Sequence, residues 1–171
     1  VLTEEEFSKG FDAFFKGDDA MWREAMEQSQ LENGMIDYIL WSSLLKPSDL
    51  PQLVAGCRQA GPLAMAAPTD EEVELIERMF ERGHNLAREA ASMGTRLLID
   101  AEQVRFQPAI DNFVLELQRI YNAEDQSEIP IIYNTYQCYL KDTPERLALD
   151  IERSHRFGYH FGAKFVRGAY M

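Results

Sequence analysis

Three short apolar segments follow one another in the second half of the chain: TRLLIDA at residues 95–101, IPIIYNTYQCYL at residues 129–140 and AKFVRGAYM at residues 163–171. Their content of aliphatic, β-branched and aromatic residues predicts buried strands. Helical patterns separate them. One begins at Pro108 and the other begins at Thr143 and ends at Gly158. Strands that alternate with helices in this way are parallel, so the pattern predicts an α/β fold.

A long helix precedes the first of these strands. Thr69 and Glu72 have the spacing of a capping box, and Gly94 stands where a helix commonly ends. Residues 1–45 also have helical spacing of their aromatic residues, whereas residues 46–68 are rich in proline and glycine, which predicts a loop with at most one short helix. We therefore expect a helical arm over residues 1–68 and an α/β domain over residues 69–171.

Three parallel strands cannot cover both faces and both edges of their own sheet. The spacing of the strands matches that of a (βα)8 barrel, whose eight units need roughly 250 residues. The second domain is therefore predicted to be a partial (βα)8 barrel of the TIM type with about three strands. The chain begins at Val1 and stops at Met171 within the third predicted strand, and we expect it to be a fragment.

Composition excludes some partners. The 171 residues include 17 Lys and Arg against 29 Asp and Glu, a net charge of −12. An acidic surface disfavours nucleic acid, which binds basic surfaces. The histidines and cysteines lack the spacing of metal ligands, so no metal site is expected. No GxGxxG motif follows any predicted strand, which disfavours a Rossmann dinucleotide site.

Ligands of parallel α/β folds bind at the carboxyl ends of the strands. The first strand ends at Asp100, and alternation along the third places Lys164 and Tyr170 on one face. A lysine that faces a barrel interior needs a partner, and Asp100 is the natural one. The pair serves either catalysis or structure. Gly168 on the same face indicates either close approach of a ligand or a β-bulge.

Residues 29–40, SQLENGMIDYIL, have the glycine, isoleucine and aspartate of an EF-hand loop at the sixth, eighth and ninth places. Leu40 stands where that loop requires a glutamate with two oxygen ligands, and Asn33 and Asp37 cannot complete a calcium site by themselves. The pattern therefore predicts a degenerate EF-hand-like helix–loop–helix.

Four stretches resemble a known family: RLLIDAEQVRFQPAIDN at residues 96–112, IIYNTYQCYLKDT at 131–143, GAKFVRGAYM at 162–171 and, less closely, MIDYILWSSLL at 35–45. The family is that of the proline dehydrogenases (proline oxidases), in its mitochondrial eukaryotic branch. The resemblance implies a distorted (βα)8 barrel that holds FAD without a covalent bond. It also implies oxidation of L-proline, or of hydroxyproline, to pyrroline-5-carboxylate, the first step of proline catabolism.

The resemblance further implies transfer of electrons to a membrane quinone, association of the full protein with the mitochondrial inner membrane on the matrix side, and roles for individual residues. Asp100 lies near the substrate amine and the flavin, Lys164 near the flavin ring and Tyr170 in the substrate pocket; these are the expected catalytic residues. The expected cofactor-binding residues are Asp100, Ala101, Gln137, Lys164, Val166, Arg167, Gly168 and Ala169.

Two further points follow from comparison with the family pattern. The lysine of the family's first strand and the paired arginines of its final helix have no counterpart in the chain, so we expect these 171 residues alone to be inactive. Two other functions remain open: a Schiff-base aldolase-like barrel with Lys164 as the amine nucleophile, and a non-catalytic helix–loop–helix interaction module.

Overall fold

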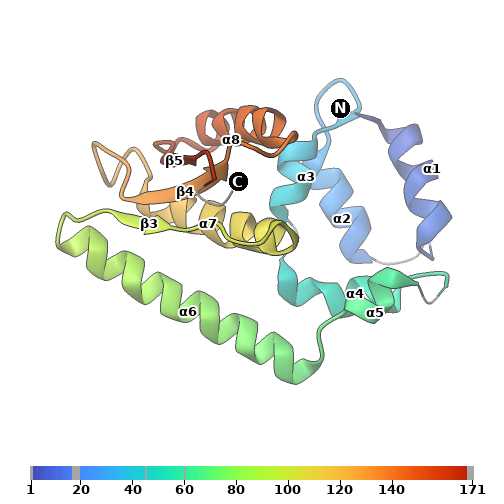
Figure 1. Cartoon of the computed structure of the whole chain (residues 1–171). Coiled ribbons are helices and arrows are strands. Elements are labelled where there is room, and N and C mark those ends of the chain that lie inside the picture. Colours follow the sequence, from blue (N-terminus) through green and yellow to red (C-terminus); the bar gives the residue numbers. More distant parts are fainter. Residues whose placement is uncertain (1, 17–19, 45, 60, 169–171) are drawn as a thin grey trace. The chain divides into compact units, whose positions relative to one another are not determined.

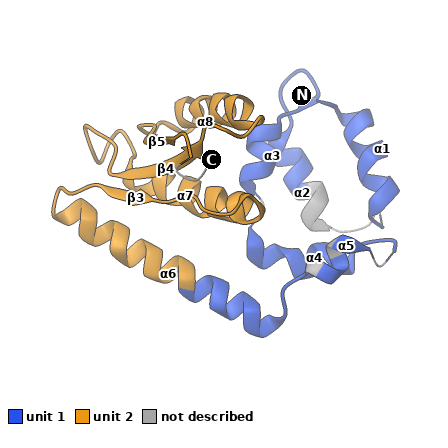
Figure 2. Ribbon diagram, viewed as in Figure 1, with its two compact units in different colours: residues 1–78 blue, residues 79–171 orange. Residues whose placement is uncertain are grey.

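The computed structural model describes residues 2–16, 20–44, 46–59 and 61–168 (Figure 1). The chain forms two compact units, residues 1–78 and 79–171, which Figure 2 distinguishes by colour. The division lies within helix α6, Asp70–Ser92. The domain boundary that the sequence places after residue 68 stays a prediction. Among the described residues, no helix has both the length and the apolar character that crossing a membrane requires.

The first unit is mainly helical, as predicted for its first 45 residues. It contains α1 (Glu4–Phe14), α2 (Ala20–Ser29) and α3 (Tyr38–Leu44). Strand β1 (Leu2–Thr3) pairs antiparallel with β2 (Met35–Ile36), which lies in the loop between α2 and α3. This small sheet ties the start of α1 to the helix–loop–helix.

The prediction of at most one short helix in residues 46–68 is wrong. The structure has a 3₁₀ helix, η1 (Pro47–Asp49), and two short α-helices, α4 (Leu50–Ala55) and α5 (Pro62–Ala66). A proline occupies one of the first two positions of each helix. Proline is tolerated there because the first N–H groups of a helix have no intrahelical partner, so these prolines start helices rather than interrupt them.

Helix α6 begins and ends at the predicted residues. The Thr69 N–H donates to the Glu72 carboxylate at 2.8 Å, and the Glu72 N–H donates to the Thr69 hydroxyl at 3.3 Å, which completes the capping box. Gly94 follows the helix with φ +61°, a conformation that favours glycine. The Thr95 N–H then donates to the Ala90 carbonyl at 2.9 Å, which closes the helix end.

The second unit contains a three-stranded parallel sheet in the order β3 (Leu97–Ile99), β4 (Ile132–Gln137) and β5 (Ala163–Val166). The 3₁₀ helix η2 (Val104–Phe106) and helix α7 (Gln107–Tyr121) connect the first two strands, and helix α8 (Thr143–Phe157) connects the last two. The predicted parallel α/β arrangement is confirmed, although each strand is shorter than expected. The described sheet is open and does not close into a barrel.

The third strand ends earlier than its composition predicts. Residues 163–171 were expected to form one strand, but β5 stops at Val166. Gly168 has φ +89°, which lies outside the range of β-strands and is readily adopted only by glycine. The predicted alternation of side chains therefore applies to Lys164 and Val166 but not to Gly168, and Gly168 is not a residue within a strand.

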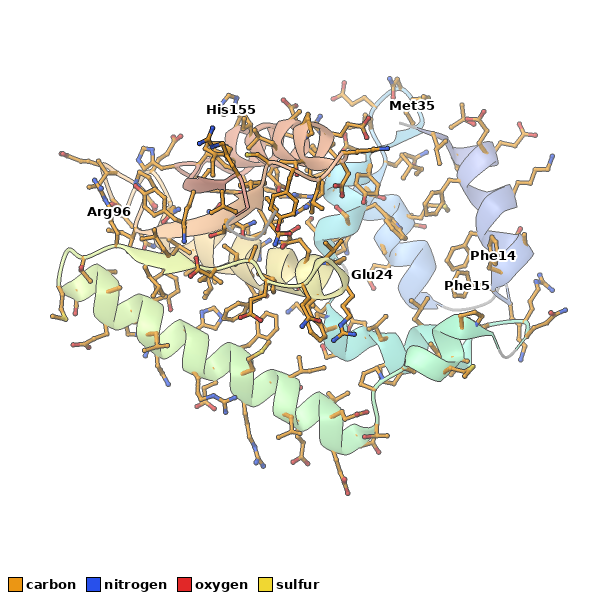
Figure 3. All side chains as sticks on the ribbon, in the orientation of Figure 1. Phe14, Phe15, Glu24, Met35, Arg96 and His155 are labelled. Atoms are coloured by element: carbon orange, nitrogen blue, oxygen red, sulfur yellow. The ribbon has the colours of Figure 1, made fainter. Side chains whose placement is uncertain are left out.

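One face of the sheet packs against helices α6 and α7, and the opposite face carries the candidate site residue Lys164. Ile132 packs in the apolar core with side chains of α6 and α7, which are Ala87, Ala90, Val114 and Leu117. By alternation, Tyr133, Thr135 and Gln137 lie on the opposite face. Register places Lys164 beside Thr135 on this face. We call it the Thr135 face. On it the guanidinium of Arg96, labelled in Figure 3, lies 5.8 Å from the centroid of the Tyr133 ring.

Buried amides at the end of α7, on Gln118 and on Asn122 directly after the helix, hold the starts of β4 and β5. The Asn122 Oδ1 accepts hydrogen bonds from the N–H groups of Ile131 and Ile132, both at 2.8 Å. Its Nδ2 donates to the carbonyls of Ile132 at 2.9 Å and His160 at 3.0 Å. The Nε2 of Gln118 donates to the Gly162 carbonyl at 2.7 Å. These bonds satisfy backbone groups at the end of the sheet opposite to the candidate site.

Candidate functional site

Asp100 and Lys164 come together on the Thr135 face, just beyond the carboxyl end of β3 and level with Thr135 of β4. Asp100 directly follows β3, Lys164 is in β5, and β4 runs between these strands. The Lys164 ammonium donates to the Asp100 carboxylate. The predicted contact between the two side chains is therefore confirmed, whereas their catalytic role stays a prediction. Both are accessible, with 34% of the Lys164 side chain and 69% of the Asp100 side chain exposed.

The Lys164 ammonium holds the pKa of Asp100 below its usual range, first through the hydrogen bond and then through its charge. The Thr135 hydroxyl adds a smaller effect in the same direction, and slight burial opposes both. The Asp100 carboxylate is therefore ionised at neutral pH. Because both groups are open to solvent, the pair adds little to folding stability.

Thr135 connects this pair to the sheet. Only 1% of Thr135 is exposed, and its hydroxyl donates to the Ile99 carbonyl at 2.8 Å and lies 3.5 Å from an Asp100 oxygen. No role is predicted for Thr135 from the sequence. The sequence does contain an indication of a role: Thr135 is two residues before Gln137 and therefore lies on the same face of the strand.

Gln137 presents a buried acceptor at the end of β4. Its Nε2 donates to the Glu102 carbonyl at 2.6 Å. Its Oε1 is buried and has no hydrogen-bond partner among the described residues. Buried carbonyl oxygens are rarely left unpaired, so this atom is suited to a ligand that brings an N–H donor. Between Asp100 and Glu102, Ala101 is half-buried.

The remaining predicted residues lie at and beyond the end of β5. The Val166 carbonyl accepts a hydrogen bond from the Cys138 N–H at 2.8 Å, which ties the end of β5 to β4. Arg167 and Gly168 follow the strand and are exposed. Ala169 and Tyr170 lie outside the described residues. The structure thus brings Asp100 and Lys164 into contact and leaves the relation of Tyr170 to them untested.

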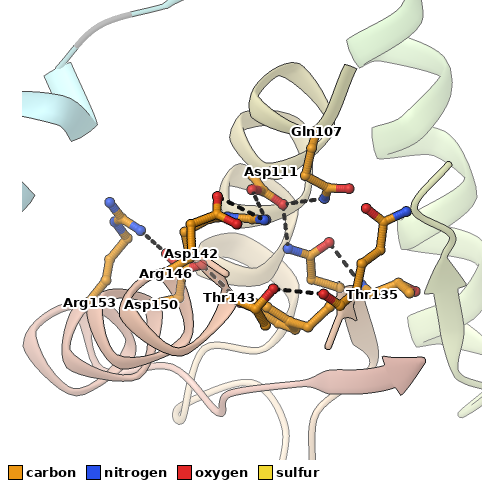
Figure 4. A network of polar contacts seen from close by, with 11 residues as sticks. Gln107, Asp111, Thr135, Asp142, Thr143, Arg146, Asp150 and Arg153 are labelled. Carbon is orange, nitrogen blue, oxygen red and sulfur yellow. Dashed lines mark hydrogen bonds and ion pairs between the residues drawn. The ribbon is translucent and has the colours of Figure 1, made fainter. Parts of the chain in front are cut away.

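A polar network lies on the other face of β4 (Figure 4). Asp111 of α7 accepts hydrogen bonds from the Asn134 Nδ2 at 2.9 Å and from the Gln107 Nε2 at 2.8 Å. It also forms a salt bridge with Arg146 of α8. Sequence reasoning missed this network. The sequence feature that could have indicated the network is Asn134, a polar residue in the apolar interior of a predicted strand.

The EF-hand-like loop uses its polar side chains for backbone contacts. The Asn33 Oδ1 accepts a hydrogen bond from the Met35 N–H at 3.1 Å, and the Asp37 Oδ1 accepts one from the Leu40 N–H at 3.0 Å. In the described parts of the chain, no group of three or more His, Cys, Asp or Glu side chains could hold a metal ion.

Comparison with known proteins identifies the family. The family model described as proline dehydrogenase matches residues 2–171. "Proline dehydrogenase 1, mitochondrial" of Homo sapiens is 45% identical over 143 residues, which cover 81% of this chain and 23% of that protein. The protein of the same description from Bos taurus is 43% identical over 143 residues, with the same coverage.

"Hydroxyproline dehydrogenase" of Rattus norvegicus is 37% identical over 131 residues, which cover 76% of this chain and 28% of that protein. The chain thus spans about a quarter of the length of these three relatives. No solved structure gives a significant match to it. Because the family model matches the chain almost from end to end, the chain belongs to the proline dehydrogenase family, as its motifs indicate, and is similar to the mitochondrial type.

Proposed function

We propose that the protein carrying this chain is an FAD-dependent oxidoreductase that oxidises L-proline or hydroxyproline to the corresponding pyrroline carboxylate and passes the electrons to a quinone. The observation that carries the proposal is the contact between Asp100 and Lys164 just beyond the end of β3, on the face of the parallel sheet that also carries the buried Gln137. Family membership and the names of the relatives support the substrate class.

We propose that the parallel sheet is part of a (βα)8 barrel whose interior contains the Thr135 face. Each outer strand of the described sheet, β3 and β5, pairs with one neighbour. Parallel strands with unpaired edges are stabilised by further strands, and a closed barrel removes the edges altogether. In such a barrel the carboxyl ends of the strands surround the active site.

The side chains at these strand ends are suited to a flavin. The unpartnered Oε1 of Gln137 can accept a hydrogen bond from an N–H group of the isoalloxazine ring. On the basis of the family resemblance, Lys164 and Arg167 are proposed to supply positive charge at the flavin, and Asp100, Ala101, Val166, Gly168 and Ala169 are proposed as further cofactor-binding residues. When bound, the flavin supplies the hydride acceptor.

The carboxylate of Asp100 is suited to the substrate amine. The Asp100 carboxylate is ionised at neutral pH, so its oxygen can accept a hydrogen bond from the substrate's ring N–H and hold the amine in place. Fixing the amine fixes the adjacent carbon, whose C–H bond is broken, and such orientation contributes to the rate. Tyr170 is proposed to contact the substrate on the basis of the family resemblance.

The names of the relatives favour a mitochondrial location. We propose that the full protein associates with the matrix side of the inner membrane, where a membrane quinone can accept its electrons. The aldolase alternative is disfavoured by the contact that Lys164 makes. Amine nucleophiles are activated in apolar pockets or beside other cations, whereas this amine is paired with a carboxylate.

The test uses the full-length protein, purified and examined for a flavin absorption band and for reduction of a soluble quinone by L-proline or 4-hydroxyproline. We expect bound flavin, activity with one or both substrates, and a loss of activity in Asp100→Ala greater than in the exposed control Asp125→Ala. A protein without flavin in which borohydride traps a substrate on Lys164 would instead support the aldolase.

A further inference from the structure

We propose that Thr135 is a positioning residue: its hydroxyl fixes the end of β3 and thereby the direction in which Asp100 presents its carboxylate to Lys164 and the substrate. The inference rests on the proposed function, since it assigns Asp100 to the substrate amine. Thr135 itself is not proposed to contact substrate or cofactor.

The geometry of the hydroxyl carries the argument. The Ile99 carbonyl that accepts the Thr135 proton at 2.8 Å belongs to the peptide unit that joins Ile99 to Asp100. Holding this carbonyl limits rotation of that peptide unit, and the orientation of the unit sets the direction of the Asp100 side chain. The same hydroxyl lies 3.5 Å from an Asp100 oxygen, so it faces the carboxylate as well as the backbone.

Packing alone does not place Asp100, because 69% of its side chain is exposed. Within the described residues, its carboxylate has two polar partners: the Lys164 ammonium, which donates to it, and the Thr135 hydroxyl, which lies 3.5 Å away and gives its proton to the Ile99 carbonyl. The lysine is a long side chain with many rotamers, whereas Thr135 is buried and has restricted χ1 angles. Thr135 is therefore the more rigid of the two partners.

The other face of the sheet holds Thr135 in turn. The Thr135 N–H donates to the Asn134 Oδ1 at 2.9 Å, and the Asn134 Nδ2 donates to Asp111 of α7. Asp111 also binds Arg146 of α8 (Figure 4). A continuous path of hydrogen bonds thus runs from two helices through β4 to the residue that precedes Asp100. Such a path holds the hydroxyl in one place, which is what a positioning residue requires.

The test compares Thr135→Val, which keeps the shape but removes the hydroxyl, with Thr135→Ser, which keeps the hydroxyl. Ser154→Ala is the matched control, since Ser154 is equally buried and donates to a backbone carbonyl at 2.7 Å within α8. In the full-length protein loaded with flavin, we expect kcat/KM to fall about tenfold in Thr135→Val, the loss of one hydrogen bond. Thr135→Ser should restore most of it.

Rescue by the conservative variant separates positioning from folding. Thr135→Ser should recover kcat/KM, and Ser154→Ala should keep it near the wild-type value. A loss in Ser154→Ala as large as in Thr135→Val, or no recovery in Thr135→Ser, would overturn the proposal.

A second measurement does not depend on turnover. In the flavin-free protein, amide hydrogen exchange in the segment after β3, residues 100–102, should be faster in Thr135→Val than in wild type or Thr135→Ser. Unchanged exchange would refute the positioning role even if the wild type proved inactive towards proline. A wild type without proline oxidation but with the expected exchange pattern would refute the proposed function alone.

Discussion

Replacement of Asn122 by alanine should destabilise the second unit more than any surface substitution. The side chain is fully buried and accepts from two backbone N–H groups at the start of β4, both at 2.8 Å. Alanine leaves both donors without this acceptor, at about 1–3 kcal/mol for each buried group. The carbonyls of Ile132 and His160 also lose a donor, although that of Ile132 keeps a bond from Gln118 at 3.3 Å. The expected loss is therefore about 3–6 kcal/mol.

Urea unfolding followed by far-UV circular dichroism measures this loss. A typical slope of about 1–3 kcal/mol per molar urea converts it into a midpoint lower by at least about 1 M. Asn85→Ala is the matched control, because Asn85 is exposed on α6 and accepts a hydrogen bond from the Arg88 side chain. Its effect should stay within about 0.5 kcal/mol. If Asn122→Ala unfolds at the same urea concentration as Asn85→Ala, the amide does not hold β4 in the way described.

Three further outcomes are expected. Gly162→Ala should destabilise the protein by about 1–3 kcal/mol in urea unfolding, because the new Cβ would lie 2.2 Å from a backbone oxygen of β4. Gly10→Ala, in an open position of α1, should instead stabilise it by about 0.5–1 kcal/mol; equal effects of the two substitutions would contradict the geometry. Lys164→Met should raise the pKa of Asp100 in an NMR titration of its carboxyl carbon. An unchanged titration would refute the pairing. The small stability that the pair contributes is present above the ordinary carboxyl pKa and disappears as pH falls through the lowered pKa. Gln137→Leu should weaken flavin retention in the full-length protein about tenfold on dialysis, and full retention would argue against a cofactor contact at that amide.

Much of the fold was predictable because local rules govern it. The capping box of Thr69 and Glu72 and the glycines after α6 and α8 satisfy or terminate helix ends within a few residues of chain. Alternation of helices and apolar segments requires parallel strands irrespective of detailed packing. The contact of Asp100 with Lys164 was also predictable, because parallel pairing brings the end of the first strand close to the third, and a lysine that faces the interior of the fold needs a partner.

Other features depend on contacts that a linear pattern does not contain. The short helices of residues 46–68 were missed because proline signals both a loop and a helix start, and only the observed backbone distinguishes the two. The third strand looked longer than it is because its composition continues beyond Val166, whereas the positive φ of Gly168 ends it.

The sequence alone determined the order and type of the elements in the second half, the parallel sheet, the family and the residues at the strand ends. Only the tertiary structure decided how these residues are held. Strand register places Thr135 beside Lys164 and lets its hydroxyl reach the last carbonyl of β3. Packing of α7 against β4 places Asp111 beside Asn134 and Asn122 against the backbone of Ile132. Hydrogen bonds between residues distant in sequence require this three-dimensional register, since no local spacing encodes which side chains will meet.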